Sequence, residues 1–185
     1  MIQDILFAIW FLLPAALANS APVFAAAMPL IKRFDAPIDG KKTWRNREIL
    51  GPHKTWRGLI AGIIVATLVL WAQQLLSERF EWAQYIAGDV DYASLPVLVL
   101  GPAFAIGALG GDAIESFFKR QRGLKSGKSW VPFDQLDYII GSVLVSLAFV
   151  ILSPTQYLWI FIVWFIGHLI ASYIGYKLGL KKDPI

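Results

Sequence analysis

The hydrophobic residues of this chain are gathered in a few long runs, and polar residues separate one run from the next. Most runs hold about 17 or more mainly apolar residues, the length that an α-helix needs to cross a bilayer. We expect five such helices, at about residues 5–31, 58–77, 95–111, 138–153 and 156–177. The pattern therefore predicts an all-α integral membrane bundle rather than a soluble domain.

The first run is interrupted by Pro14 and Pro22, with Asn19 between them. A helix that contains prolines is tolerated in lipid where its neighbours satisfy the freed backbone groups, so we expect this run to pack against other helices. The segment before it, residues 1–4, lacks the basic residues of a secretory signal. We therefore interpret the first run as a retained membrane helix.

The distribution of charge predicts the orientation. The chain has 17 Lys and Arg against 13 Asp and Glu, and it has no cysteine, which excludes disulfides and thiolate metal sites. Eight basic residues lie in segment 32–57 and five in segment 119–135; the others are Arg79, Lys177, Lys181 and Lys182. With five spans, both basic segments and the C-terminus fall on one side, which the positive-inside rule makes cytoplasmic.

We therefore expect a multi-pass protein of the cell membrane, with its N-terminus outside and its C-terminus inside. Residues 1–185 would form a single membrane-embedded domain. Two cytoplasmic loops, at about residues 32–57 and 119–137, would form the functional site on the cytoplasmic face.

The first candidate cluster precedes the second span. Gly51 and Pro52 form a turn, and Lys54, Thr55 and Arg57 supply donors where the helix begins. Free backbone N–H groups and the helix dipole favour an anion at such a position, which indicates a phosphate-binding loop that also contains His53. The alternative is an ordinary basic flank of a membrane helix, and the sequence leaves both interpretations open.

The second cluster follows the third span, whose helix we expect to continue beyond the bilayer surface. Asp112, Ser116 and Lys119 are spaced at i, i+4 and i+7 and share one helix face with Glu115. Carboxylates at membrane depth are costly and are usually functional. The alternative is a salt bridge at the helix end, from Asp112 or Glu115 to Lys119.

The third cluster opens the fourth span, where Asp134 and Asp137 are three residues apart. Taken alone, these two residues fit helix capping and the helix dipole. Asp112 reaches the same membrane face from the preceding helix, however. Three convergent carboxylates beside a basic phosphate loop indicate Mg²⁺ bound by oxygen ligands and bridging substrate phosphates.

Two further polar features are ambiguous. The basic segment 119–128 contains Lys119, Arg120 and Lys125, which could neutralise a triphosphate or contact anionic lipid headgroups. His168 lies inside the last span, where a hydrogen-bonded interior residue is more common than a ligand.

The clusters together resemble the CTP-dependent cytidylyltransferases that activate phosphatidate-type lipids. The resemblance rests on Ser116-Phe117-Phe118-Lys119-Arg120, followed by Asp134-Gln135-Leu136-Asp137 at the start of a membrane helix. The chain departs from the bacterial and eukaryotic pattern at Val131-Pro132-Phe133, which replaces a His-Gly-Gly turn, and at Gln135, which replaces an arginine. Lys125 is the nearest counterpart of a missing Lys-Asp pair. The small size and the string from Gly51 to Gly58 look like the archaeal branch, the CDP-archaeol synthases.

The resemblance implies a reaction of CTP with 2,3-bis-O-geranylgeranyl-glycerol 1-phosphate, which gives the CDP-lipid and pyrophosphate. The partners implied are CTP, a lipid phosphate with isoprenoid chains and the bilayer, without nucleic acid. Asp112, Asp134 and Asp137 would hold Mg²⁺, and Lys119 would act with them in catalysis. The residues expected to bind the nucleotide, the lipid phosphate or pyrophosphate are Asn46, Gly51, His53, Lys54, Thr55, Arg57, Ser116, Arg120 and Lys125.

Two alternatives are weaker. A CDP-alcohol phosphotransferase carries Asp residues at successive helical turns with Asp-Gly and Ala-Arg pairs, a pattern that we do not find. A membrane transporter is expected to carry ionisable residues near mid-membrane, whereas these carboxylates gather at one face.

Overall fold

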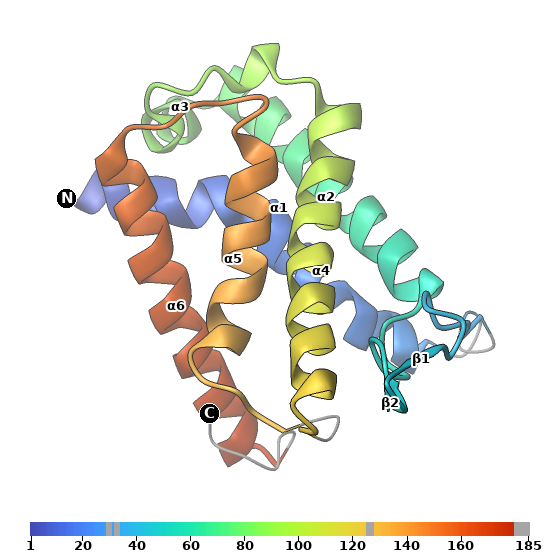
Figure 1. Cartoon of the computed structure of the whole chain (residues 1–185). Helices are drawn as coiled ribbons and strands as arrows, with labels where there is room; N and C mark the ends of the chain where they lie inside the picture. The colour runs from blue at the N-terminus through green and yellow to red at the C-terminus, as the bar shows by residue number, and fades with distance from the viewer. Residues whose placement is uncertain (29–30, 32–33, 125–127, 180–185) are drawn as a thin grey trace.

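The structure is a computed structural model that describes residues 1–28, 31, 34–124 and 128–179. The described part of the chain is mainly helical, with one small hairpin. The helices are α1 (Ile2–Ala27), α2 (Trp56–Arg79), α3 (Glu81–Ala87), η1 (Tyr92–Ser94), α4 (Val97–Gln121), α5 (Phe133–Ser146) and α6 (Pro154–Lys177), and the strands are β1 (Thr43–Trp44) and β2 (Arg47–Glu48). Figure 1 shows α4, α5 and α6 side by side, with α1 crossing behind them.

Four helices of the described chain are long and apolar enough to cross a membrane: α1, α2, α4 and α6. Their outer faces carry large apolar side chains at helical spacing. On α2, for example, Ile60, Ile64, Leu68 and Trp71 are all more than half exposed. Apolar stripes of this extent are a surface for lipid chains, because a water-facing helix would carry polar residues there.

Among the five expected spans, the fourth, at residues 138–153, differs most from the helix that the structure shows. Helix α5 begins at Phe133 and ends at Ser146, so its 14 residues rise about 21 Å, less than the hydrocarbon thickness. Its first turn forms early because the N–H groups of Phe133 and Asp134 both donate to the Trp130 carbonyl. The chain turns again before α6, where Ser153 caps the new helix and Pro154 occupies its first position.

Helix α1 runs through both of its prolines. Pro14 has no N–H to donate to the carbonyl of Trp10, and the Gln73 side chain of α2 donates to that carbonyl instead, at 2.6 Å. This contact confirms at Pro14 the expected compensation by a neighbouring helix. On the other side, the Trp164 indole of α6 donates to the Ala8 carbonyl at 2.8 Å, so α1 is joined to helices on two sides.

The β1–β2 hairpin, the C-terminal end of α4 and the N-terminal end of α5 lie at one end of the molecule, together with the C-terminal end of α6 (Figure 1). Helix α3 and the 147–153 connection lie at the opposite end. The hairpin turn uses Arg45 and Asn46 at φ 51° and 59°, the left-handed values that a tight two-residue turn requires. The Arg47 guanidinium donates to the Gln121 carbonyl and so joins the hairpin to the end of α4.

Glycines allow α4 and α5 to cross closely. A Cβ atom at Gly107 would lie 2.6 Å from the Gly141 carbonyl oxygen, and one at Gly111 would collide with the carbonyl of Asp137. This close crossing brings Asp112, the residue after Gly111, beside Asp137 of the neighbouring helix. The small residues of the interface therefore position two of the carboxylates that the sequence singled out.

Candidate active site

A polar cavity of ≈ 310 Å³ lies toward the hairpin end of the bundle, between α1, α4, α5, α6 and the segment before α2. The segment before α2 contributes one wall, and four helices contribute the rest. The lining residues are Asn19, Leu50, His53, Lys54, Asp112, Glu115, Ser116, Lys119, Arg120, Asp134, Asp137 and His168. Most of these side chains are charged or polar, which distinguishes the cavity from the apolar faces around it.

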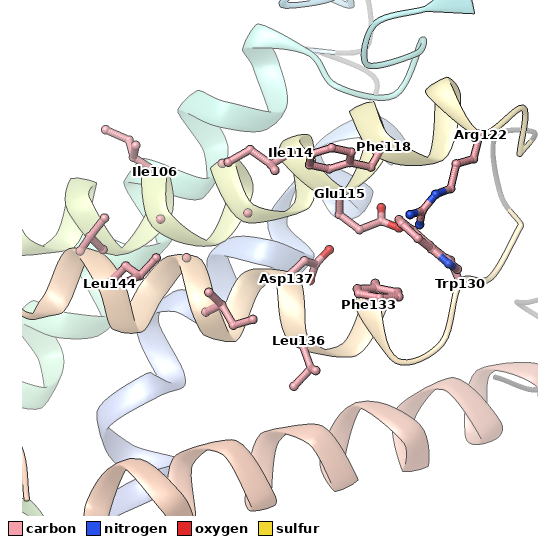
Figure 2. Close-up of a pocket in the computed structure, with 16 residues that line it drawn as sticks. Ile106, Ile114, Glu115, Phe118, Arg122, Trp130, Phe133, Leu136, Asp137 and Leu144 are labelled. Carbon is pink, nitrogen blue, oxygen red and sulfur yellow. The ribbon is translucent and has the colours of Figure 1, made fainter. Parts of the chain in front are cut away.

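Three carboxylates converge in this cavity. Asp112 and Glu115 follow one another on the same face of α4, and Asp137 approaches from α5; one oxygen of each lies within 4.8 Å of the others. Figure 2 shows Glu115 on α4 and Asp137 on the facing side of α5. Carboxylate oxygens at this spacing are suited to a hard divalent cation such as Mg²⁺ or Ca²⁺, which prefers oxygen ligands.

Two lysines balance the carboxylates. Lys54 Nζ lies 2.5 Å from Asp112, and Lys119 Nζ lies 2.5 Å from Asp134 and 3.2 Å from Glu115. Lys119 and Glu115 are buried, so their attraction is screened less than that of a surface pair. The lysines are long and flexible, and each could exchange a carboxylate for a phosphate oxygen without leaving the cavity.

The structure brings many of the predicted site residues to the cavity wall. They are His53, Lys54, Asp112, Ser116, Lys119, Arg120, Asp134 and Asp137. Asp134 differs from the other two aspartates in its contacts: one oxygen pairs with Lys119, and the other accepts the Trp130 N–H at 2.8 Å. Glu115 is the residue that joins Asp112 and Asp137 in the three-carboxylate group.

Other predicted residues lie around the cavity. Thr55 is buried and caps α2, accepting the Gly58 N–H at 3.2 Å, while Arg57 pairs with Asp35 at 2.8 Å. Gly51 has φ 89°, which suits glycine at a turn. Asn46 is exposed in the hairpin turn, away from the cavity wall. Lys125 lies outside the described residues.

Sequence reasoning assigned no role to Asn19 or Leu50, and it interpreted His168 as an interior residue. In the structure all three line the cavity. The Oδ1 atom of Asn19 is buried and, in the described structure, has no hydrogen-bond partner. The sequence did contain one feature that could have identified Asn19 as a site residue: it is a polar residue between two prolines in an apolar run. The His168 ring lies 5.9 Å from that of Tyr138, so α6 also contributes to this polar region.

The chain is similar to known proteins over nearly its whole length. Residues 1–185 match the protein family described as CarS-like: CDP-archaeol synthase. The CDP-archaeol synthase of Thermococcus kodakarensis is 34% identical to this chain over 185 residues, covering 99% of this chain and 98% of that protein. The enzyme of the same name from Methanosarcina mazei is 40% identical over 184 residues, covering 94% and 99% respectively.

A solved structure has the same fold. It is described as an intramembrane enzyme for archaeal membrane lipids biosynthesis, and it matches with a TM-score of 0.70 at 30% sequence identity. The match covers 89% of this chain and 92% of the solved chain. The similarity to this solved structure therefore extends over most of the chain.

Proposed function

Since the chain belongs to the CDP-archaeol synthase family, and is thus a CTP-dependent cytidylyltransferase of the membrane, we propose that the polar cavity is its active site. The reaction joins the cytidylyl group of CTP to a lipid phosphate and releases pyrophosphate. For this chain we propose 2,3-bis-O-geranylgeranyl-glycerol 1-phosphate as the lipid. The observation that carries the proposal is the convergence of Asp112, Glu115 and Asp137 in a cavity that also holds Lys54, Lys119 and Arg120.

The donor set fits a divalent metal ion, because three carboxylates from two helices offer oxygens within 4.8 Å of one another. We take Mg²⁺ as the ion, held by Asp112, Glu115 and Asp137. When bound, it neutralises charge on the triphosphate and withdraws electrons from the phosphorus that is attacked. Asp134, the third ligand expected from the sequence, shares Lys119 with Glu115. A shift of Lys119 toward phosphate would free both carboxylates for metal binding.

The role of the cavity residues in this reaction is mainly to neutralise the charge of the phosphates. A phosphate monoester has a second pKa near 6, so the lipid headgroup is largely a dianion at neutral pH and attacks without a general base. The repulsion between this dianion and the triphosphate must be overcome. Lys54 and His53 would hold the triphosphate, and Lys119 and Arg120 would receive the lipid phosphate or the leaving pyrophosphate.

The proposed topology has five spans in a single domain of residues 1–185, with the N-terminus outside. The segment Phe133–Ser146 with the 147–153 connection would form the fourth crossing. The basic loops at about 32–57 and 119–137 would face the cytoplasm and carry the active site of a cell-membrane enzyme. The grouping of these loops at one end in Figure 1 supports this topology.

The test is an assay of purified protein in detergent, with CTP, Mg²⁺ and the lipid phosphate and with pyrophosphate release as the readout. We expect Asp112→Asn and Asp137→Asn each to lower kcat at least about 100-fold, because each loses a negative charge that would hold the Mg²⁺. Asp89→Asn, an exposed acidic residue at the other end of the molecule, is the matched control. Wild-type rates in the two cavity variants would refute the site. Release of CMP from CDP-lipid, without pyrophosphate from CTP, would instead indicate a phosphotransferase.

A further inference from the structure

The segment that leads to α2 reaches the polar cavity through residues 50–54, which we call the cavity arch. Leu50, His53 and Lys54 of the cavity arch line the polar cavity, and Lys54 pairs there with Asp112. The cavity arch follows the β1–β2 hairpin, which lies beside the N-terminal end of α2 in Figure 1, and it ends where α2 begins. The contacts at its two ends therefore determine where the His53 side chain lies.

Two adjacent residues hold both ends of the cavity arch. At its first residue, the Leu50 N–H donates to Oδ2 of Asp39 at 3.0 Å. At its last residue, the Lys54 carbonyl accepts the Ile38 N–H at 2.8 Å. Because Ile38 and Asp39 are neighbours in the chain, these two contacts keep the ends of the cavity arch close together.

The Asp39 carboxylate makes two different contacts. Its Oδ2 atom reaches Leu50, eleven residues ahead, while its Oδ1 atom accepts the Lys41 N–H at 3.0 Å and so turns the chain locally. Lys41 has φ 60°, an uncommon value for a residue other than glycine, and the contact with Oδ1 helps to hold it there. An ionised acceptor forms a stronger hydrogen bond than a neutral one, which suits a single side chain that has to hold the end of a loop.

We propose that Asp39 is a positioning residue for the reaction: through Leu50 it holds the cavity arch, and with it His53, against the polar cavity. This inference rests on the proposed function, in which His53 and Lys54 hold the triphosphate. Asp39 is not among the residues that line the polar cavity, so it acts through the arch and not on the nucleotide itself. Loss of its contact frees the first part of the arch, whereas Lys54 keeps its carbonyl contact and its ion pair.

Asp39→Asn tests this role, because the amide has the shape of the carboxylate. Its oxygen can still accept the Lys41 N–H, but its NH₂ group meets the Leu50 N–H as a second donor. We expect KM for CTP to rise about tenfold, since the unpaired Leu50 donor and the loosened arch both weaken binding of the triphosphate. The kcat at saturating CTP should stay within about twofold of wild type, because the contact positions a binding group and not the reacting atoms. The Mg²⁺ concentration for half-maximal activity should not change.

Asp91→Asn is the matched control. Asp91 makes the same kind of local turn, accepting the Ala93 N–H at 3.1 Å, at the end of the molecule opposite the hairpin. It should leave both KM and kcat at wild-type values. A wild-type KM in Asp39→Asn would overturn the positioning role, and so would a loss confined to kcat, which a smaller folded fraction produces. An unaltered protein that releases no pyrophosphate from CTP would instead refute the proposed function.

Amide hydrogen exchange tests the Asp39 contact without an activity assay. In the full chain in detergent, we expect Asp39→Asn to speed exchange in a peptide covering residues 49–54 at least about tenfold, since the Leu50 N–H loses its acceptor. Peptides of α4 that contain Asp112 should exchange as in the unaltered protein, which shows that the bundle is intact. Equal exchange of the 49–54 peptide in both proteins would show that Asp39 does not hold the cavity arch and would overturn the proposal.

Discussion

Lys119 contacts two carboxylates, and the sequence alone could not show which of them is the better candidate for a metal ligand. Glu115 and Asp134 both contact its ammonium group, and only Glu115 belongs to the three-carboxylate group with Asp112 and Asp137. The helix spacing of Asp112 and Glu115 is evident from the sequence. The position of Asp134 relative to them depends on how α4 and α5 cross, and a local spacing pattern does not contain that information.

A magnesium titration separates the two carboxylates. We expect Glu115→Gln to raise the Mg²⁺ concentration for half-maximal activity by about 10- to 100-fold, and Asp134→Asn to raise it less. The physical reason is that Glu115 is a metal ligand in the proposed site, whereas Asp134 contacts Lys119 and the Trp130 N–H. Glu78→Gln, exposed near the end of α2, is the control. The reverse order of effects would make Asp134 the ligand, as the sequence suggested.

Single polar residues were predictable where they flank an apolar run, directly before or after it. His53, Lys54 and Lys119 belong to polar clusters at such ends, and all three line the cavity. Asn19 and His168 lie within apolar runs. A polar residue at such a position can be explained by a single hydrogen bond to a neighbouring helix, without any role in a functional site. Their place in the cavity wall follows from the packing of α1 and α6, which the sequence alone did not predict.

At the scale of elements, the crossing of α4 and α5 invites a pair of neighbouring substitutions. Gly111→Ala would place a methyl group against the Asp137 carbonyl, whereas Gly110→Ala meets no atom within 4 Å. We expect Gly111→Ala to destabilise the fold by about 1–3 kcal/mol and to lower activity, because the helices must separate. Denaturation in detergent and the pyrophosphate assay measure both effects. Equal behaviour of the two variants would contradict the close crossing.

The contact between α1 and α2 gives a second prediction for an element. Gln73→Leu would leave the Trp10 carbonyl without its donor, at a cost of about 1–3 kcal/mol in unfolding free energy. Pro14→Ala restores an N–H within α1 that can reach the same carbonyl. The double variant should therefore lose less than the two single changes added together, as measured in a thermodynamic cycle. Additive losses would show that Gln73 does not compensate for Pro14.

Elements were predicted unevenly. Helices α1, α2, α4 and α6 follow directly from apolar runs, and the expected extension of α4 beyond its run is confirmed by its end at Gln121. Helix α5 was expected to begin later in the chain, because its N-terminal end includes Asp134 and Asp137, and these acidic residues lower the mean hydropathy there. The hairpin was missed because each of its strands has only two residues and its turn contains no glycine.

At the scale of the whole molecule, the proposed orientation can be measured because the chain contains no cysteine. A single cysteine at Asp89→Cys should react with a membrane-impermeant thiol reagent on intact cells. Lys42→Cys, in the segment before the hairpin, should react only after permeabilisation. Both positions are exposed, so the difference would report the side of the membrane. The opposite pattern would invert the topology.

The hairpin also has a consequence for the loop that presents His53 and Lys54. Arg47 fastens this loop to the end of α4 on one side, and the Thr55 cap fastens it to α2 on the other. A short segment anchored at both ends has little conformational entropy left to lose. In the proposed function, nucleotide would therefore bind to a preorganised surface, and more of the attraction between Lys54 and phosphate would remain as affinity.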